Sequence, residues 1–324
     1  MKLKEFYDNA IAIGRENDPR GKEIVAKDLL ARKRAFDSLK EDEREFFDQE
    51  ALSNPYSDSR ILNGSGQEDI KNILVGIDID VGEVLLSERL GEKGRGIDLL
   101  LSHHPGGRAY AGLYDVLHIQ ADILHRFGVP ISTAEDLTDG RMREVERKLM
   151  PANHARPVDA ARLLGMPFLC LHTPADNMVA TYLQRTFDEN KPYTVAEVID
   201  ILKGIPEYRE ASRNGVGPKV LLGSGTRKAG TIFVDMTGGT EGSKEIFSSM
   251  AAGGVNTIVA MHLSEEHRKE AEKSHLNVVI AGHISSDNLG MNLLLDELTK
   301  SAGSPFTIYE CSGFRRFSRT ASSA

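Results

Sequence analysis

Short, nearly continuous apolar runs alternate with helical stretches along most of this chain, and that alternation constrains its fold more than any other feature. Runs at 72–79 (NILVGIDI), 97–101 (IDLLL) and 167–171 (PFLCL) have the length of strands buried on both faces. Further runs follow in the second half, at 219–222, 231–235, 257–261, 277–280 and 306–311. The pattern predicts an α/β protein with two α/β domains, whose mixed sheets are flanked by helices.

Breaks in this pattern suggest a division into three segments. We expect residues 1–70 to form a helical N-terminal extension packed on the first domain. Residues 71–190 are then a first α/β domain with a helical insertion near 108–160, and residues 191–324 are a second α/β domain. Residues 315–324 are polar and predict a frayed tail.

The charge balance and the apolar runs exclude several classes of protein. With 40 Lys and Arg against 48 Asp and Glu the net charge is −8, which argues against nucleic acid as a partner. No run approaches the roughly 20 apolar residues that a membrane helix needs, and residues 1–7 do not resemble a secretory signal. Two cysteines do not make a disulfide framework. We therefore expect a soluble, cytoplasmic protein with no membrane partner.

Histidines recur at the polar ends of the apolar runs. They are the pair His103–His104, then His172 with Asp176 four residues on, and His283 with Asp287 four residues on. Ligand sites in open α/β sheets lie at the carboxyl ends of strands. Imidazole and carboxylate together suit zinc, iron or manganese, so the pattern predicts a metal site. Because both halves of the chain contribute, we expect that site in the cleft between the two domains.

Local geometry adds two expectations. His103 and His104 should point to opposite sides of an extended backbone, so that each could serve one of two neighbouring ions. Ser285 or Ser286 should cap the following helix, which would leave His283 before it and Asp287 in its first turn. A carboxylate is favoured in a first turn even without a metal, so a structural role for Asp287 stays open.

The motifs that carry these residues resemble those of a known family. Residues 73–80 followed by Leu99–Pro105 are similar to a strand and a His-His-Pro loop, Leu171–Asp176 to His-Thr-x-x-Asp, and 281–290 to Gly-His-x-x-Ser-Glu. In this order they resemble the NGG-interacting factor three (Nif-three-like) family of dinuclear metal-centre proteins. Some members of that family carry the label GTP cyclohydrolase I type 2. Here Asp287 stands where the family usually has glutamate.

This resemblance implies roles for particular residues. His103, His104, Asp176, His283 and Asp287 fall on the family's metal ligands, and His172 is a ligand or a neighbour that supports one. Glu266 and His267 are weaker candidates for proton transfer, because 261–267 lies where the family has a Thr-Gly-Glu segment. The resemblance also implies two divalent ions per chain and a ring-shaped homo-hexamer.

These features favour a metal-dependent hydrolase in which two ions activate a bridging water. Its substrate would be a small molecule such as a nucleotide, a phosphoester or a cyclic amide. The alternatives are a non-catalytic metal-storage or scaffold protein that forms a ring, and a structural metal site that ties the two halves together. One further segment, Thr237–Ser243 (TGGTEGS), follows a predicted strand; it is either an anion-binding loop or a flexible one.

Overall fold

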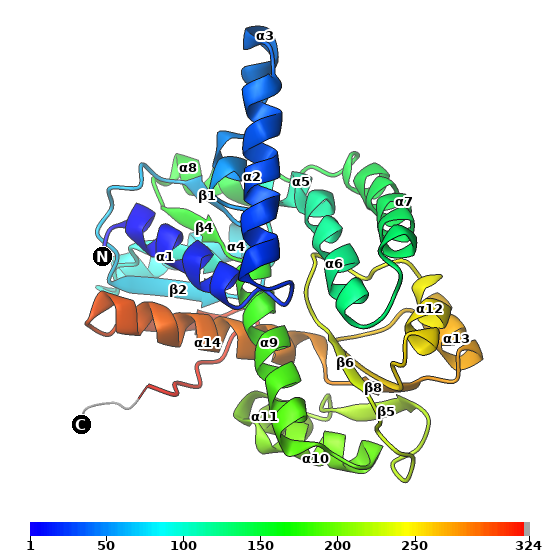
Figure 1. Cartoon of the computed structure of the whole chain (residues 1–324). Helices are drawn as coiled ribbons and strands as arrows, with labels where there is room; N and C mark the ends of the chain where they lie inside the picture. The colour runs from blue at the N-terminus through cyan, green and yellow to red at the C-terminus, as the bar shows by residue number, and fades with distance from the viewer. Residues whose placement is uncertain (321–324) are drawn as a thin grey trace.

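A computed structural model describes residues 1–320 of the chain, which contain two mixed sheets flanked by helices (Figure 1). The strand order of the first sheet is β1 (Arg60–Asn63), β4 (Phe168–Cys170), β3 (Leu99–Ser102), β2 (Asn72–Gly76) and β9 (Thr307–Cys311). That of the second is β5 (Lys219–Leu222), β8 (Asn277–Ile280), β7 (Thr257–Ala260) and β6 (Ile232–Asp235). Only β1 and β5, each at a sheet edge, run antiparallel to their neighbours. The predicted fold class is confirmed.

The strands form where the apolar runs predicted them, with one addition. Leu99, Leu100 and Leu101 of β3 are completely buried, as expected for a strand covered on both faces. Strand β1 was missed, because Ile61 and Leu62 are its only apolar residues and its pairing with β4 is interrupted by a bulge. Strand β9, near the end of the chain, returns to the first sheet beside β2.

Two long helices, α9 (Thr173–Asn190) and α14 (His283–Ala302), join the two sheets (Figure 1). Ala175 and Met178 of α9 and Leu294 of α14 pack in the core of the first sheet. Leu183 of α9 and Leu289 of α14 pack in a core under the second sheet. Since each helix contributes apolar side chains to both cores, the ends of these helices are held in place between the sheets.

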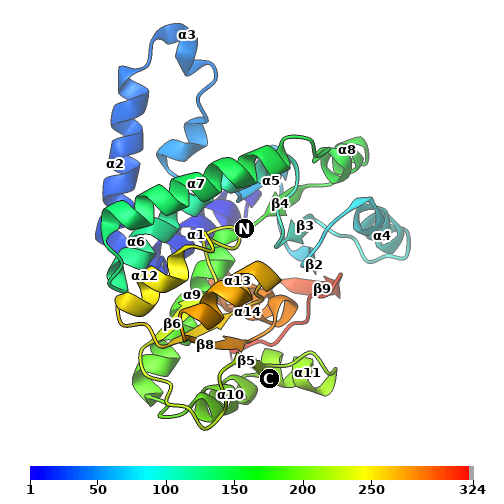
Figure 2. The same ribbon diagram turned by 90° about the vertical axis from the view of Figure 1, so that its right-hand side faces the viewer.

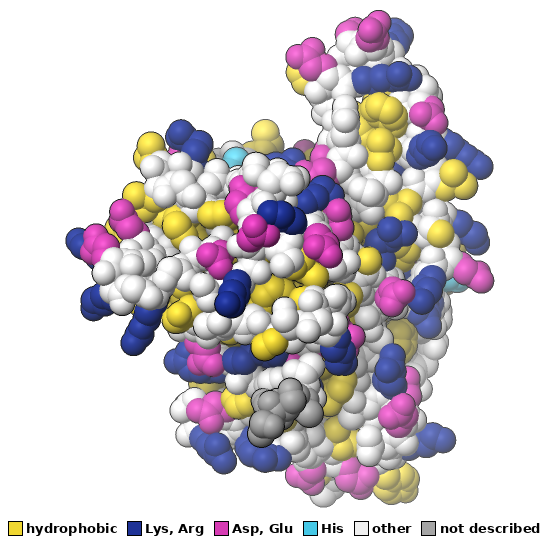
Figure 3. Space-filling model, turned by 90° about the vertical axis from the view of Figure 1, so that its left-hand side faces the viewer, with side chains coloured by type: hydrophobic (Ala, Val, Ile, Leu, Met, Phe, Trp, Pro, Cys, Tyr) yellow, Lys and Arg dark blue, Asp and Glu magenta, His cyan; other side chains and the backbone are white. Residues whose placement is uncertain are grey.

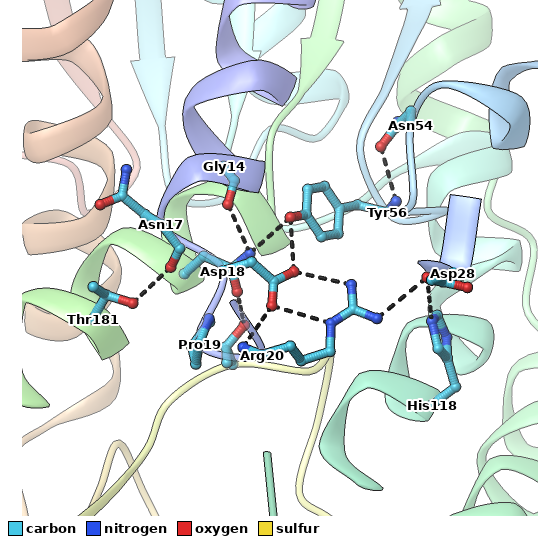
Figure 4. A network of polar contacts seen from close by, with 12 residues as sticks. Gly14, Asn17, Asp18, Pro19, Arg20, Asp28, Asn54, Tyr56, His118 and Thr181 are labelled. Carbon is cyan, nitrogen blue, oxygen red and sulfur yellow. Dashed lines mark hydrogen bonds and ion pairs between the residues drawn. The ribbon is translucent and has the colours of Figure 1, made fainter. Parts of the chain in front are cut away.

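The N-terminal segment comprises α1 (Leu3–Glu16), α2 (Lys22–Ser38), α3 (Glu41–Arg44) and the short 3-10 helix η1 (Gln49–Leu52). Asp18 and Arg20, between α1 and α2, form a buried ion pair at 3.0 Å. Around it, Tyr56 donates to Asp18, while Arg20 and His118 both contact Asp28 at 3.2 Å (Figure 4). This network ties the segment to the body of the protein.

Beyond the network, α2 and α3 project away from the body (Figure 1). Figure 3 shows hydrophobic side chains on the surface of this arm. Leu30 and Phe46, which belong to this segment, are exposed. Over the rest of the face in that view, basic and acidic side chains are interspersed.

The remaining helices cover the sheets. Helix α4 (Val81–Glu92) follows β2. The segment between β3 and β4 forms α5 (Gly107–Ala111), η2 (Leu113–His118), α6 (Ile119–Arg126), α7 (Ile131–Leu149) and α8 (Arg156–Leu163). Within it, η2, α6 and α7 pack on one face of the second sheet, through a core that includes Ile119, Ile123 and Phe233. The other face is covered by α10 (Val195–Gly204) and α11 (Pro206–Arg213) (Figure 2). Helices α12 (Ile246–Ala252) and α13 (Glu265–Lys273) complete the second unit. None of the helices in the described range has the length and apolarity needed to cross a membrane.

The predicted frayed tail is wrong for Arg315–Arg319, which lie in an ordered arrangement along α14. Asn288 accepts from the Arg315 amide at 2.6 Å, and Asn292 accepts from the Phe317 amide at 3.0 Å. Asp296, one helical turn further, accepts from the Arg319 amide at 2.9 Å. Side chains spaced four residues apart on one helix face therefore pair with every second residue of the tail. Residues 321–324 lie outside the described part of the chain.

Candidate metal centre

The carboxyl ends of the central strands of both sheets open into one cleft. In the first sheet Ser102 of β3 pairs with Cys170 of β4, so His103 and His172 follow neighbouring strand ends. In the second sheet the register pairs Asp235 with Ala260 and Ala260 with Ile280. The segments after β6, β7 and β8 therefore emerge together, and they line one pocket with His172, Asp176, His283 and Asp287.

All six metal-binding candidates are brought together in this cleft. Their nitrogen and oxygen atoms form three overlapping groups, each with atoms within 4.8 Å of one another: His103, His104 and His172; His103, Asp176 and Asp287; and His104, His283 and Asp287. His103 Nε2 lies 3.4 Å from Asp176 Oδ1 and 3.5 Å from Asp287 Oδ1. The other Asp287 oxygen, Oδ2, lies 3.4 Å from His104 Nε2 and 3.6 Å from His283 Nε2. Asp287 thus connects two groups, one through each oxygen.

From the sequence we expect the two adjacent histidines to point to opposite sides of the backbone. In the structure they do not. The chain bends at His103 and His104, whose amides donate to Gly76 O and Ile77 O. In this bent backbone both rings face the cluster, with centroids 5.2 Å apart. They still divide between the two groups, since His103 is next to Asp176 and His104 is next to His283.

Helix α14 begins earlier than predicted, at His283, and its cap residue is Gly282 rather than a serine. Ser286 instead donates its hydroxyl to Gly282 O at 2.6 Å, within the first turn. His283 and Asp287 consequently lie one turn apart on the same helix face. Gly290, one turn further, crosses α9 so closely that a Cβ there would lie 2.4 Å from Ala175 O. This close crossing brings Asp287 to Asp176.

Three histidines of the cluster, His103, His104 and His172, each have an acceptor close to Nδ1. Nδ1 of His172 lies 2.8 Å from Asp58 Oδ2, and Nδ1 of His104 lies 2.8 Å from Asp78 Oδ1. Nδ1 of His103 faces the carbonyl oxygen of Leu171 at 3.3 Å. An Nδ1–H that donates to oxygen leaves the Nε2 lone pair free, and this arrangement orients histidine ligands in metalloproteins. Here every Nε2 faces the carboxylates of the cluster.

The carboxylates themselves fit a bound cation. Asp176 Oδ1 and both oxygens of Asp287 are buried and have no hydrogen-bond partner among the described residues. Buried charge without a partner is costly, and a divalent ion between carboxylate and imidazole would compensate it. The donor set of histidine nitrogen and aspartate oxygen suits zinc, iron or manganese.

The pKa values of the two aspartates are driven apart. Burial, aided by the charges of Asp287 and Asp58, raises the pKa of Asp176 to about 8. Burial acts in the same direction on Asp287, but the rings of His103 and His104 hold its pKa well below the ordinary value. For His172, burial is outweighed by Asp176 and Asp58, which raise its pKa to about 9. At neutral pH the metal-free cluster therefore retains protons that bound ions would displace.

The two weaker candidates lie outside the cluster. Glu266 is exposed and forms an ion pair with Lys244 at 2.6 Å. His267 borders the pocket, but its Nδ1 contacts Ser264 Oγ at 2.6 Å and its Nε2 donates to Gly242 O at 2.9 Å. With both ring nitrogens engaged, His267 is positioned to hold the neighbouring loop.

Three other residues lie at the site, although they are not among the candidates named from the sequence. The ring of His262 lies 4.9 Å from that of His283, and its Nδ1 is 3.3 Å from Glu241. Asp78 lies just beyond β2, so the rule that sites occupy strand ends could have identified it. Asp58 precedes the strand that was missed, and its sequence carries no signal for contact with His172.

Comparison with one solved structure supports the fold. The chain is similar to a NIF3 superfamily protein from Sphaerobacter thermophilus, with 28% identity over 79% of this chain and 91% of that chain and a TM-score of 0.68. Reduced HcgD from Methanocaldococcus jannaschii has 15% identity, coverage of 83% and 94% and a TM-score of 0.49. A Bacillus cereus protein related to NIF3 has 11% identity, coverage of 78% and 89% and a TM-score of 0.41. No family model and no curated protein matches the chain.

Proposed function

Because this chain has the fold of the NIF3 superfamily and gathers a buried His/Asp cluster in its cleft, we propose that it is a dinuclear, divalent-metal-dependent hydrolase. The observation that carries the proposal is the division of the cluster into two groups that share Asp287. One group contains His103 and Asp176, and the other contains His104 and His283. A carboxylate with one unpartnered oxygen toward each group is suited to hold two neighbouring ions.

The chain's own residues fix and shape this site. Asp58 and Asp78 orient His172 and His104, while the buried crossing of α9 and α14 fixes Asp176 against Asp287. When bound, divalent ions at such a site supply Lewis-acid activation of water and of a substrate carbonyl or phosphoryl oxygen. Beside the cluster, the ring of His262 lies 4.9 Å from that of His283, and its Nδ1 pairs with Glu241.

Access to the cluster favours catalysis over closed storage. A structural metal site is closed, whereas a catalytic site keeps a position for water or substrate. The side chains of His104 and His283 are 25% and 42% exposed, although Asp287 is buried. The pocket that His283 and Asp287 line has a volume of about 90 Å³, which suits the reacting group of a small molecule. A nucleotide, a phosphoester or a cyclic amide provides such a group.

The test is metal content per chain, together with hydrolysis of a panel of these substrates. Wild-type protein purified without chelator should hold about two ions of zinc, iron or manganese per chain. His103→Ala/His104→Ala should lose both the metal and the hydrolysis. His118→Ala, which removes a histidine paired with Asp28 in the N-terminal network, should retain both. Full metal retention in the double variant would overturn the proposal.

Two outcomes separate the alternatives. Stoichiometric metal with no hydrolysis of any substrate would favour a storage or scaffold protein. One ion per chain that rises to two in Asp287→Glu would show that the aspartate holds the second ion too weakly. We also propose self-association into a homo-hexamer, which light scattering of the purified chain would test.

A further inference from the structure

The loop Thr237–Ser243 borders the pocket beside the metal cluster, and the function proposed above gives its backbone no role. Its residues line the same pocket as His172, Asp176, His283 and Asp287. Thr237 donates its hydroxyl to Asn177 Oδ1 at 2.7 Å, and Asn177 is the residue next to Asp176. The loop is therefore tied to the helix that carries part of the cluster.

Side chains of the helical insertion hold the loop by donating hydrogen bonds to the carbonyl oxygens of the loop. Nε2 of Gln120, a buried side chain of α6, donates to Gly238 O at 3.0 Å and to Thr240 O at 2.8 Å. Nε of Arg141 in α7 donates to Glu241 O at 2.9 Å. On the other side, His267 takes the next carbonyl oxygen, that of Gly242.

The glycines of the loop are required by this close packing. A Cβ on Gly238 would lie 2.6 Å from Gln120 Cγ, and one on Gly242 would lie 2.7 Å from Gln120 Oε1. Gly238 and Gly239 also have positive φ angles, of 98° and 84°. Of the two interpretations left open by the sequence, a flexible loop is therefore the poorer one, since contacts fix this backbone along most of its length.

With the carbonyl oxygens engaged, the amides are turned the other way. The peptide bonds are trans among the described residues, so the N–H of each residue points opposite to the preceding C=O. The amides of Gly239 and Glu241 thus point away from Gln120, and that of Gly242 points away from Arg141. These N–H groups have no acceptor in the part of the chain that the structure describes. The amide of Thr240, which lies between them, donates to Gly238 O at 3.1 Å. The adjacent unpaired amides of Glu241 and Gly242, together with that of Gly239, can form an anion-binding concavity.

We infer that the loop Thr237–Ser243 binds the phosphate group of a phosphoester substrate and holds it against the metal cluster. This inference rests on the proposed function and narrows its substrate class. The 90 Å³ pocket bounded by the loop and the cluster accommodates a group of that size. The one carboxylate of the loop, that of Glu241, is directed to the Ser264 amide at 2.7 Å and to His262. It is thus already compensated when a phosphate approaches.

The rest of the substrate has a place beside this pocket. A larger groove of about 740 Å³ shares Glu241, Gly242 and Ser243 with it, and its far wall includes Arg147 and Lys148 of α7. The insertion consequently has two tasks. It fixes the backbone of the loop through three of its carbonyl oxygens, and it forms part of the groove that would take the body of the phosphoester.

Gln120→Leu tests the inference, because leucine removes both donors that hold the loop while keeping a similar volume. Inorganic phosphate is titrated into metal-loaded wild-type and variant protein by calorimetry, and metal content is measured on the same samples. We expect phosphate to bind the variant at least about tenfold more weakly, since a loop released from Gln120 no longer holds its amides in position for charge-assisted hydrogen bonds. Metal content should be unchanged. Gln184→Leu is the matched control, because Gln184 donates to Ile232 O of the same sheet but does not touch the loop.

Equal phosphate affinity in wild type and Gln120→Leu at equal metal content would overturn the inference and leave the metal centre standing. Acetate that binds as tightly as phosphate would overturn the choice of phosphate. If the variant does not fold, hydrogen exchange of wild-type protein tests the inference instead. The same measurement applies if the wild type holds no metal, a result that would refute the proposed function but not phosphate binding by the loop. Phosphate should slow hydrogen exchange of the 237–243 amides. Unaltered exchange there would refute phosphate binding by this loop.

Discussion

Asp58→Asn tests whether a residue remote in sequence from every metal-binding candidate sets the metal affinity. The Asp58 carboxylate is completely buried, and it accepts from His172 Nδ1 at 2.8 Å and from Thr173 Oγ1 at 2.6 Å. Asparagine has the same shape, and its oxygen can take the position of Oδ2. Its amide group then faces the Ser59 hydroxyl, which can accept the new donor. The substitution therefore removes a charge and leaves the geometry in place.

The expected loss follows from the hydrogen bond that changes. A bond to a charged acceptor contributes about 1.5–3 kcal/mol and a neutral one about 0.5–1.5 kcal/mol. The difference of about 1–1.5 kcal/mol corresponds to roughly tenfold weaker metal binding. That is at the lower end of the roughly 10–100-fold losses seen when partners of metal-bound histidines are removed. Asp58→Ala, which also frees the ring to rotate, should approach the upper end.

Competition against a chromophoric chelator measures the zinc affinity of each variant, and the melting temperature of metal-free protein reports on folding. Asp28→Asn is the matched control, because Asp28 also pairs with a histidine, His118 at 3.2 Å, in the N-terminal network. It should leave zinc affinity unaltered. If Asp58→Asn folds normally and binds zinc as tightly as wild type, His172 is not a ligand that Asp58 supports, and the reasoning fails.

Three further predictions concern metal removal, pH and the tail. Chelation should lower the melting temperature of wild type by roughly 5–10 °C if the metal had been present at about 100 times its dissociation constant, and Asp287→Asn should show no such shift. Metal uptake at pH 7 should release protons, because the pKa of Asp176 is raised to about 8 and that of His172 to about 9. Affinity should thus increase from pH 6 to pH 9, and calorimetry in buffers of different ionisation enthalpy counts the protons. Asn292→Ala should lower the free energy of unfolding in urea by about 1–2 kcal/mol, because it removes hydrogen bonds to the partly buried Phe317 amide and Arg315 carbonyl group. Asn190→Ala, at an exposed position, should change it by less than about 0.5 kcal/mol.

The candidate site was predictable to the extent that its residues follow buried strands. His103 and His172 come directly after apolar runs that can only be central strands, and parallel strands align their carboxyl ends. His283 and Asp287 lie one turn apart on one face of α14 because the helix begins at His283. With a serine cap His283 would have preceded the helix, so their alignment on one face was decided by the structure.

The partners of these residues were not predictable in the same way. Asp58 and Asp78 are separated from the histidines they contact by 114 and 26 residues, and no local pattern links them. The tail was judged frayed because its own composition is polar, whereas its order comes from Asn288, Asn292 and Asp296 on another element. The loop 237–243 remained ambiguous because its glycines permit either flexibility or close packing, and only the contact with Gln120 distinguishes them.

The sequence by itself determined the elements of this protein and the chemistry at their ends. Periodicity of apolar residues is a local property, so it defined strands, helices and the histidines and aspartates that follow them. The tertiary structure alone decided how those ends face one another, which oxygens remain without partners and which helices hold the cleft. These depend on contacts between residues far apart in the chain, and such contacts form only when α9 and α14 pack against both sheets.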